Sequence, residues 1–149
     1  MYDWLKFIHV VAVTIWVGGG ILIAVQSPRL LATRERPVQA AAVRLSLFAG
    51  RVFTVAAIVA LATGIWMVLD AEFIEFSQAW ISLGFLGIAV GAVLGSAVYG
   101  PTGRRMLAAI DAGDDGTLTA LSQRMGMATA GEILVLLVVI WSMVFKPGL

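Results

Sequence analysis

The sequence predicts an all-α polytopic membrane protein, a four-transmembrane-helix up-and-down bundle formed by a single domain, residues 1–149. Composition is the first observation: 60% of the 149 residues are hydrophobic and 13% are charged, whereas about a quarter of the residues in a soluble domain are charged. Second, the apolar residues gather in four runs, each with roughly the twenty residues that a helix needs to cross a bilayer. These runs are residues 4–26, 45–69, 79–99 and 125–145. Third, helix-breaking residues separate the runs, namely Pro28, Pro37, Pro101, Gly113 and Gly116.

The first run, residues 4–26, is expected to be a helix that is retained in the mature protein. It is too long for the apolar core of a signal peptide, and its positive charge follows the run instead of preceding it. It contains His9, the one histidine of the sequence. Because an ionisable residue inside a span is costly, its default interpretation is functional. Further along, Trp16 precedes Gly18, Gly19 and Gly20, which allow a close approach or a local kink.

Arg51 in the second run and Glu132 in the fourth are the other ionisable residues inside predicted spans. At 1.5 Å per residue, both lie roughly 10 Å from the cytoplasmic end of their span. This matched depth predicts a structural ion pair that clamps the two helices in register. Two alternatives stay open. The pair belongs to a proton or ion path, or the two side chains do not meet, so that Arg51 reaches the headgroups and Glu132 is protonated or faces a cavity.

The third run, residues 79–99, carries a stripe of small residues. Gly87, Gly91 and Gly95 repeat a small-xxx-small pattern that lets another helix approach closely. We expect this stripe to pack against another helix of the same chain. The alternative is a homodimer, or a docking face for a larger membrane complex.

The connecting segments predict the orientation in the membrane. Arginines concentrate between the first and second runs and between the third and fourth, whereas the connection between the second and third is acidic. By the positive-inside rule, the arginine-rich connections are cytoplasmic and both termini lie outside. Residues 38–50 and 102–112 are expected to be helical, and residues 111–116 to form a turn. Tryptophans map to the outer ends of all four spans: Trp4, Trp66, Trp80 and Trp141.

Composition also excludes several classes of chemistry, and we expect no catalytic residues. Without cysteine, the chain forms no disulfide and uses no thiolate for catalysis or metal binding. One histidine cannot supply the three ligands of a catalytic zinc site. The arginines flank the spans and therefore form no nucleic-acid-binding patch. A nucleotide-binding glycine motif must follow a strand. The glycines of the first run lie within a predicted helix, so they do not form such a motif.

His9 is the candidate metal ligand. It lies about five residues inside the outer end of its span, and Met67 and Met143 lie near the outer ends of the second and fourth spans. One imidazole with one or two thioethers suits haem iron or Cu(I). Haem bound by two histidines would require a second His9 from another subunit. The alternative is a histidine satisfied by a backbone carbonyl or a Ser or Thr hydroxyl, with methionines that only fill gaps in the packing.

Three motifs in the first thirty residues resemble the first helix of the copper-resistance D-like integral membrane proteins: Trp4-Leu5-Lys6-x-x-His9, Trp16-x-Gly18-Gly19 and Pro28-Arg29-Leu30. Downstream motifs are similar to an uncharacterised bacterial branch of predicted integral membrane proteins: Arg51-x-Phe53, Thr63-Gly64 and Gly100-Pro101-x-x-Arg104-Arg105. The opening is also distantly similar to the haem-pathway protoporphyrinogen oxidase family. These resemblances imply a multi-pass protein of the bacterial inner membrane, with haem b bound through His9. The oxidase-type relatives carry a lysine in the third helix that residues 79–99 lack, so oxidation of protoporphyrinogen is not expected.

We therefore expect a small integral membrane protein that binds haem b, or copper as the second choice, through His9. It would act as an accessory or redox-linked protein rather than an enzyme. Trp16, Gly18 and Gly19 would shape the wall of the cofactor pocket, and Met67 or Met143 would lie opposite His9. The alternative is a cofactor-free structural or assembly subunit of a larger membrane complex.

Overall fold

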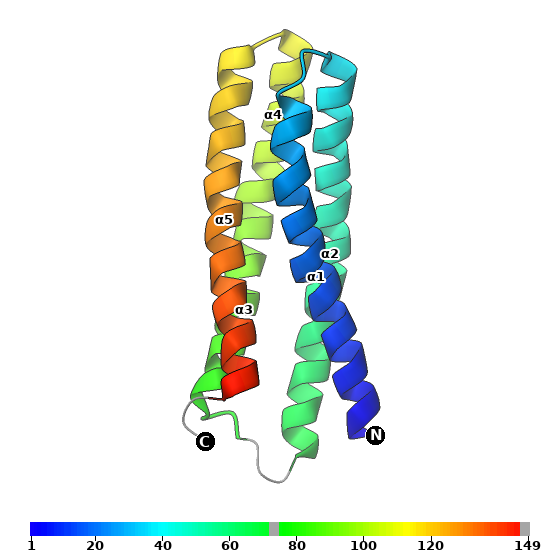
Figure 1. The fold of residues 1–149 in the computed structure, drawn as a ribbon, viewed down its shortest axis with the longest axis vertical. Coiled ribbons are helices and arrows are strands. Elements are labelled where there is room, and N and C mark those ends of the chain that lie inside the picture. Colours follow the sequence, from blue (N-terminus) through cyan, green and yellow to red (C-terminus); the bar gives the residue numbers. More distant parts are fainter. Residues whose placement is uncertain (72–74, 147–149) are drawn as a thin grey trace.

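The computed structural model describes residues 1–71 and 75–146, and this part of the chain is helical, without strands. The elements in order are α1 (Tyr2–Leu31), α2 (Arg36–Asp70), α3 (Ala79–Val93), the π-helix η1 (Leu94–Tyr99), α4 (Gly100–Ala112) and α5 (Asp115–Phe145). α3, η1 and α4 follow one another without a break and form one curved rod (Figure 1). The described chain therefore contains four helical rods that are long and apolar enough to cross a membrane, which confirms the predicted fold class.

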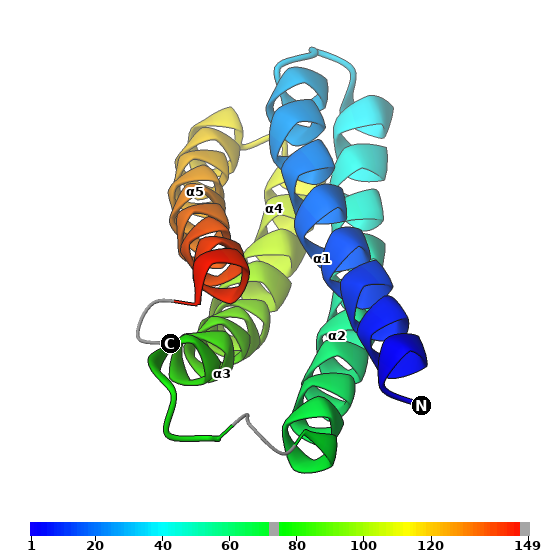
Figure 2. The same ribbon diagram turned by 60° about the horizontal axis from the view of Figure 1, so that its bottom comes forward.

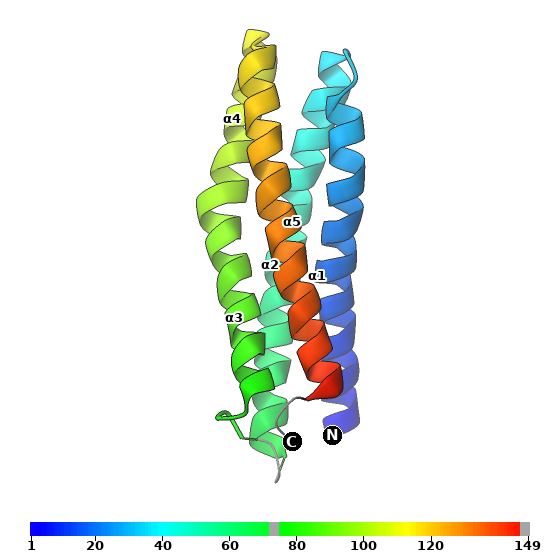
Figure 3. The ribbon, with the colours of Figure 1, turned by 60° about the vertical axis from the view of Figure 1, so that its left-hand side comes forward.

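The four rods run up and down in an antiparallel bundle. The N-terminus and the end of α5 lie at the same end, and the short turns at residues 32–35 and 113–114 lie at the other (Figures 1 and 3). We call the latter the arginine-rich end. α1 pairs with α2, and α5 pairs with α3 and α4, so the bundle consists of two helical hairpins (Figure 2).

The helices extend beyond the predicted spans at the arginine-rich end. The segments predicted to be helical outside the spans, residues 38–50 and 102–112, lie in α2 and α4. There the starts of α2 and α5 pack with α4 around an apolar cluster, because each presents apolar residues at helical spacing. The cluster consists of Val43, Met106, Ala109, Ile110, Leu118 and Leu121. The long connections expected from hydropathy alone are therefore reduced to two short turns.

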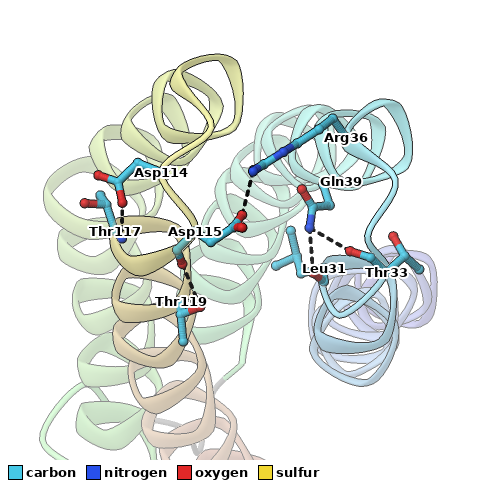
Figure 4. A network of polar contacts seen from close by, with 8 residues as sticks. All are labelled: Leu31, Thr33, Arg36, Gln39, Asp114, Asp115, Thr117 and Thr119. Carbon is cyan, nitrogen blue, oxygen red and sulfur yellow. Dashed lines mark hydrogen bonds and ion pairs between the residues drawn. The ribbon is translucent and has the colours of Figure 1, made fainter.

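Hydrogen bonds and an ion pair close the arginine-rich end (Figure 4). Gln39, which is 5% exposed, donates from Nε2 to the carbonyl oxygens of Leu31 at 3.0 Å and Thr33 at 2.8 Å. These acceptors belong to the end of α1, where carbonyl groups lack partners within the helix. Arg36 forms an ion pair with Asp115, with 2.7 Å between Nη2 and Oδ1, which joins the start of α2 to the start of α5.

The turn between α4 and α5 falls within residues 111–116, as predicted. Gly113 has a φ of 74°, a left-handed conformation that glycine adopts without steric cost and that commonly ends a helix. Asp114 is then the N-cap of α5, since its Oδ1 accepts a hydrogen bond from the backbone N–H of Thr117 at 2.9 Å. The hydrogen bonds from Thr117 lower the pKa of the Asp114 carboxyl below its usual value.

The π-helix η1 has a local cause in Pro101. Proline lacks a backbone N–H, and its ring clashes with the carbonyl group four residues earlier. Just before it, the backbone N–H of Gly100 bonds to the carbonyl of Gly95, five residues back, which is the π-helical pattern. The wider turn lets the rod continue from α3 into α4 and sets the position of Tyr99, the last residue of η1.

The tryptophans agree only in part with a uniform aromatic belt. Trp4, Trp66 and Trp141 are exposed, as expected for rings at the membrane interface. Trp80 instead is buried against Val68, Ile81 and Met143. Its neighbours come from three helices, so Trp80 contributes to the packing of the bundle at the end opposite the arginines.

Candidate functional site

His9 lies on α1 and faces α2. Its Nδ1 is 2.9 Å from the carbonyl oxygen of Ala60 and 3.1 Å from the hydroxyl oxygen of Thr63. Because a carbonyl can only accept, Nδ1 carries a proton and donates it. A Cβ at Gly64 would lie 3.3 Å from His9 Cε1, closer than most such contacts, so the glycine gives the imidazole room against α2.

The other ring nitrogen of His9, Nε2, makes no hydrogen bond to the part of the protein that the structure describes. Within residues 1–71 and 75–146, no hydrogen bond involves Nε2 of this half-buried residue. In a neutral imidazole with its proton on Nδ1, Nε2 keeps a lone pair for a metal. Metal-binding histidines are commonly oriented by a hydrogen bond from the second nitrogen to a backbone carbonyl. The hydrogen bonds of Nδ1 are therefore compatible with two roles for His9: a metal ligand, or a histidine that only contributes to helix packing.

The structure separates the two candidate methionine ligands. Met67 follows Thr63 and Gly64 by one helical turn, so it belongs to the stripe of α2 that faces His9. Met143 packs between α5 and α3, where its methyl carbon lies 2.8 Å from a Cβ position on Gly84. Among the described residues, no group of three or more His, Asp or Glu side chains gathers as a metal site.

Trp16 and Gly19, the expected wall of a cofactor pocket, make packing contacts in the structure. A Cβ at Gly19 would clash with the ring of Phe53 from α2, whereas nothing lies within 4 Å of such a carbon at Gly18. Trp16 is buried in the centre of the bundle, with its ring directly against Gly91 of α3. The space beside Gly19 is therefore filled by a side chain, and Trp16 packs between Ala56 of α2 and the second hairpin, against Gly91 and Leu136.

Glu132 marks a second polar site, on α5. Its side chain is buried, with a residue exposure of 9%. Oε2 accepts a hydrogen bond of 2.5 Å from the hydroxyl of Tyr99. Trp16 is its other polar neighbour, because the indole ring and the carboxyl group both lie against Gly91, and an indole offers only an N–H donor. Oε1 lies 3.3 Å from a Cβ position on Gly91, so the absence of a side chain there makes room for the carboxyl group.

The predicted ion pair between Arg51 and Glu132 is not formed. Arg51 is exposed on α2, and the ion pairs found among the described residues do not include it. Long cationic side chains near the end of a span reach toward the headgroups, and side chains of α2 point back toward the N-terminus of that helix, at the arginine-rich end. Neutral donors from Tyr99 and Trp16 take the place of the expected cation at Glu132.

The glycine stripe of α3 packs inside the chain. A Cβ at Gly87 would lie 3.0 Å from Cγ2 of Val139 on α5, and Gly91 is covered by Trp16. Gly95, in η1, has no atom within 4 Å of such a carbon. Two of the three glycines are therefore occupied by the protein's own helices, which corrects the alternative of a docking face built from the whole stripe.

Comparison with known families identifies the class of protein. Residues 3–147 match the family described as "Predicted integral membrane protein (DUF2269)". The chain belongs to this family. No curated protein and no solved structure matches it. Membership in the DUF2269 family, together with four apolar rods, makes this a multi-pass integral membrane protein embedded in a lipid bilayer.

The Tyr99–Glu132 contact of this DUF2269 protein is the functional feature that sequence reasoning missed. Tyr99 sits at the end of its predicted span, about eight residues beyond Gly91, so residue counting places it at the membrane surface rather than beside Glu132. Helical side chains point toward the helix N-terminus, which brings the Tyr99 hydroxyl back into the span. A signal was present in the Gly100-Pro101 dipeptide, because proline after a long apolar run marks a local change of helix geometry.

Proposed function

We propose that this protein binds haem b through His9, with copper as the second choice of ligand, and serves as an accessory or redox-linked membrane protein. The hydrogen bond from Nδ1 to the Ala60 carbonyl carries the proposal. It orients the ring and leaves Nε2 free to bind a metal. The resemblance of the first helix to haem-binding members of the copper-resistance D-like superfamily supports the same residue.

The surrounding residues have definite tasks in this proposal. Ala60 and Thr63 hold the ring in one orientation, and Gly64 gives it space. Met67, on the same stripe of α2, is the candidate for the opposite ligand within the chain; a second His9 from another copy is the alternative. A bound haem would supply one-electron redox chemistry, whose potential depends on the axial ligands and on solvent access.

An absorption spectrum of the detergent-purified protein, as isolated and after reduction, tests the proposal. From haem-replete cells we expect a Soret band and sharp reduced α and β bands, both lost in His9→Ala. Thr63→Val is the matched control, because it removes a hydroxyl beside His9 but keeps the Ala60 carbonyl. Met67→Leu should retain haem with altered bands if Met67 is the opposite ligand. A featureless wild-type spectrum, or unchanged bands in folded His9→Ala, would contradict haem binding; copper analysis of the same samples tests the second choice.

A cofactor-free structural or assembly subunit is the second candidate. The observation in its favour is that His9 already has partners in Ala60 and Thr63, as a packing histidine requires. This candidate predicts that His9→Ala lowers thermal stability but removes no metal or haem. It also predicts that a defined membrane partner co-purifies with the wild-type protein in mild detergent.

A further inference from the structure

Glu132 lies deep within the span. It precedes Trp141, an exposed tryptophan near the end of α5, by nine residues, or roughly 13 Å at 1.5 Å per residue. Since the hydrocarbon core is about 30 Å thick, the carboxyl group lies close to the middle of the membrane. An ionised carboxylate at such a depth is costly unless it is paired.

The groups that face Glu132 are neutral. α1 contributes Trp16, α3 contributes Gly91 and η1 contributes Tyr99. α2 reaches this level of the bundle with apolar residues packed on Trp16, Ala56 among them. Among the described residues, no cation pairs with Glu132. Two neutral donors compensate a carboxylate only in part, because no opposite charge is present.

Two hydroxyl groups lie near Glu132 on the side of the arginine-rich end. Tyr99 donates to Glu132, and the nearby Thr129 donates to the carbonyl of Met125 at 2.9 Å, one further turn toward the arginine-rich end. Thr129 lies one helical turn before Glu132 on α5, toward the arginine-rich end, and is only half-buried. Hydroxyl groups both donate and accept, so they can pass a proton by changing the direction of their hydrogen bonds.

On the other side of Glu132 a buried apolar cluster comes first, and the polar side chains of His9 and Thr63 lie beyond it, hydrogen-bonded to each other and to Ala60. Trp16 packs with Val17, Ala56 and Leu136 in a buried cluster. An indole N–H donates but cannot accept a hydrogen bond, so Trp16 ends the set of exchangeable groups. The apolar cluster therefore separates Glu132 from the His9 site, whereas Tyr99 and Thr129 lie on its arginine-rich side.

We propose that Glu132 is an intramembrane proton-binding site that exchanges with the arginine-rich side through Tyr99 and Thr129 and does not conduct across the membrane. The step is an acid–base exchange: the carboxylate takes one proton from the aqueous phase and becomes a neutral carboxylic acid. Its hydrogen bond with Tyr99 and its contact with the Trp16 indole change at the same time. Protonation therefore changes a contact of η1, through Tyr99, and a contact of α1, through Trp16.

Infrared difference spectroscopy of the protein in lipid bilayers tests proton binding directly. Between acidic and alkaline buffers we expect a carbonyl-stretching band of a protonated carboxylic acid that disappears in Glu132→Gln. The band should shift in frequency in Tyr99→Phe, which removes the donated hydrogen bond. Glu35→Gln is the control, because Glu35 is exposed in the turn after α1. A band with the wild-type pH dependence and frequency in Glu132→Gln would overturn the proposal.

Trp16 gives a second readout that does not need a Glu132 variant. The fluorescence difference between the wild type and Trp16→Phe reports the indole beside the carboxyl group. In vesicles of known protein orientation, we expect a pH jump on the arginine-rich side to change this difference, and a jump on the opposite side to leave it unchanged. A pH-independent difference, a response from the opposite side, or proton leakage above that of empty vesicles would contradict the proposal. None of these outcomes depends on a ligand at His9, so His9→Ala should respond as the wild type does.

Discussion

Phe53 of α2 fills the space beside Gly19 of α1: a Cβ on Gly19 would lie 2.5 Å from Cε1 of the Phe53 ring. A real side chain does not approach so closely, so the two helices pair at this distance only because Gly19 has none. The first hairpin is therefore held together at this level by a ring that lies against a glycine backbone, and the adjacent Gly18 has no such contact.

Gly19→Ala should lower the stability of the protein, because the new methyl group clashes with the Phe53 ring. We expect a loss of about 1–3 kcal/mol, as for other overpacked cores. Gly18→Ala is the matched control and should be neutral or stabilising by up to about 1 kcal/mol, since alanine favours the helix. Thermal unfolding in detergent, followed by circular dichroism, measures both. Equal effects of the two substitutions would contradict the assigned packing.

Gly87→Cys combined with Val139→Cys should form a disulfide within one chain. The Cβ position on Gly87 lies 3.8 Å from Cβ of Val139, within the range of about 3.5–4.5 Å that disulfides need. The natural sequence has no cysteine, so the new pair has no competitor. Gly95→Cys with Val139→Cys is the control and should stay reduced under mild oxidation. Covalent dimers from the Gly87 pair on a non-reducing gel would instead indicate that the stripe faces another copy.

Gln39→Ala should destabilise the arginine-rich end more than Arg36→Gln does. The first change leaves two carbonyl groups at the end of α1 without their donor, at a cost of about 1–3 kcal/mol. The second removes an ion pair whose Asp115 side chain is 76% exposed, and exposed pairs contribute about 0.2–1 kcal/mol. Unfolding measured at low and high salt checks both, because only the Arg36 effect should shrink as salt screens it.

Asp114→Ala should lower the unfolding temperature at neutral pH but have little effect in strongly acidic buffer. The folded-state pKa of Asp114 is depressed, first by the hydrogen bonds from Thr117. Its stabilising contribution is therefore fully present above the unfolded-state pKa and is lost as the pH falls through the folded-state value. Asp111→Ala, which changes an exposed carboxylate of α4, is the control. A difference between Asp114→Ala and wild type that persists at the lowest pH would argue against the cap.

The sequence predicts the four helices well because hydrophobic length and helix breakers are local properties. It also identifies the turn around Gly113, where a left-handed glycine and an N-cap aspartate have recognisable spacing. The lengths of α2 and α5 are less predictable, since their first turns are stabilised by packing on α4 rather than by hydropathy. That packing depends on tertiary contacts that no single segment encodes.

The candidate site is predicted less completely. Depth along a span follows from counting residues, and it correctly singles out Glu132 as buried. Depth does not give the direction in which a side chain points around its helix. The equal depth of Arg51 and Glu132 therefore predicted an ion pair, although Arg51 is exposed on another face. Tyr99 became the partner because η1 changes the helix geometry just before Pro101.

The position of Trp16 has a consequence for biosynthesis. Its partners Gly91 and Glu132 belong to the third and fourth rods, which the ribosome makes only after the first hairpin is complete. The indole ring therefore enters the bilayer with its α2 neighbours already made but before Gly91 and Glu132 have been synthesised. Only arrival of the last rod completes the packing around Trp16, so a truncated chain that lacks α5 would leave one side of this ring uncovered.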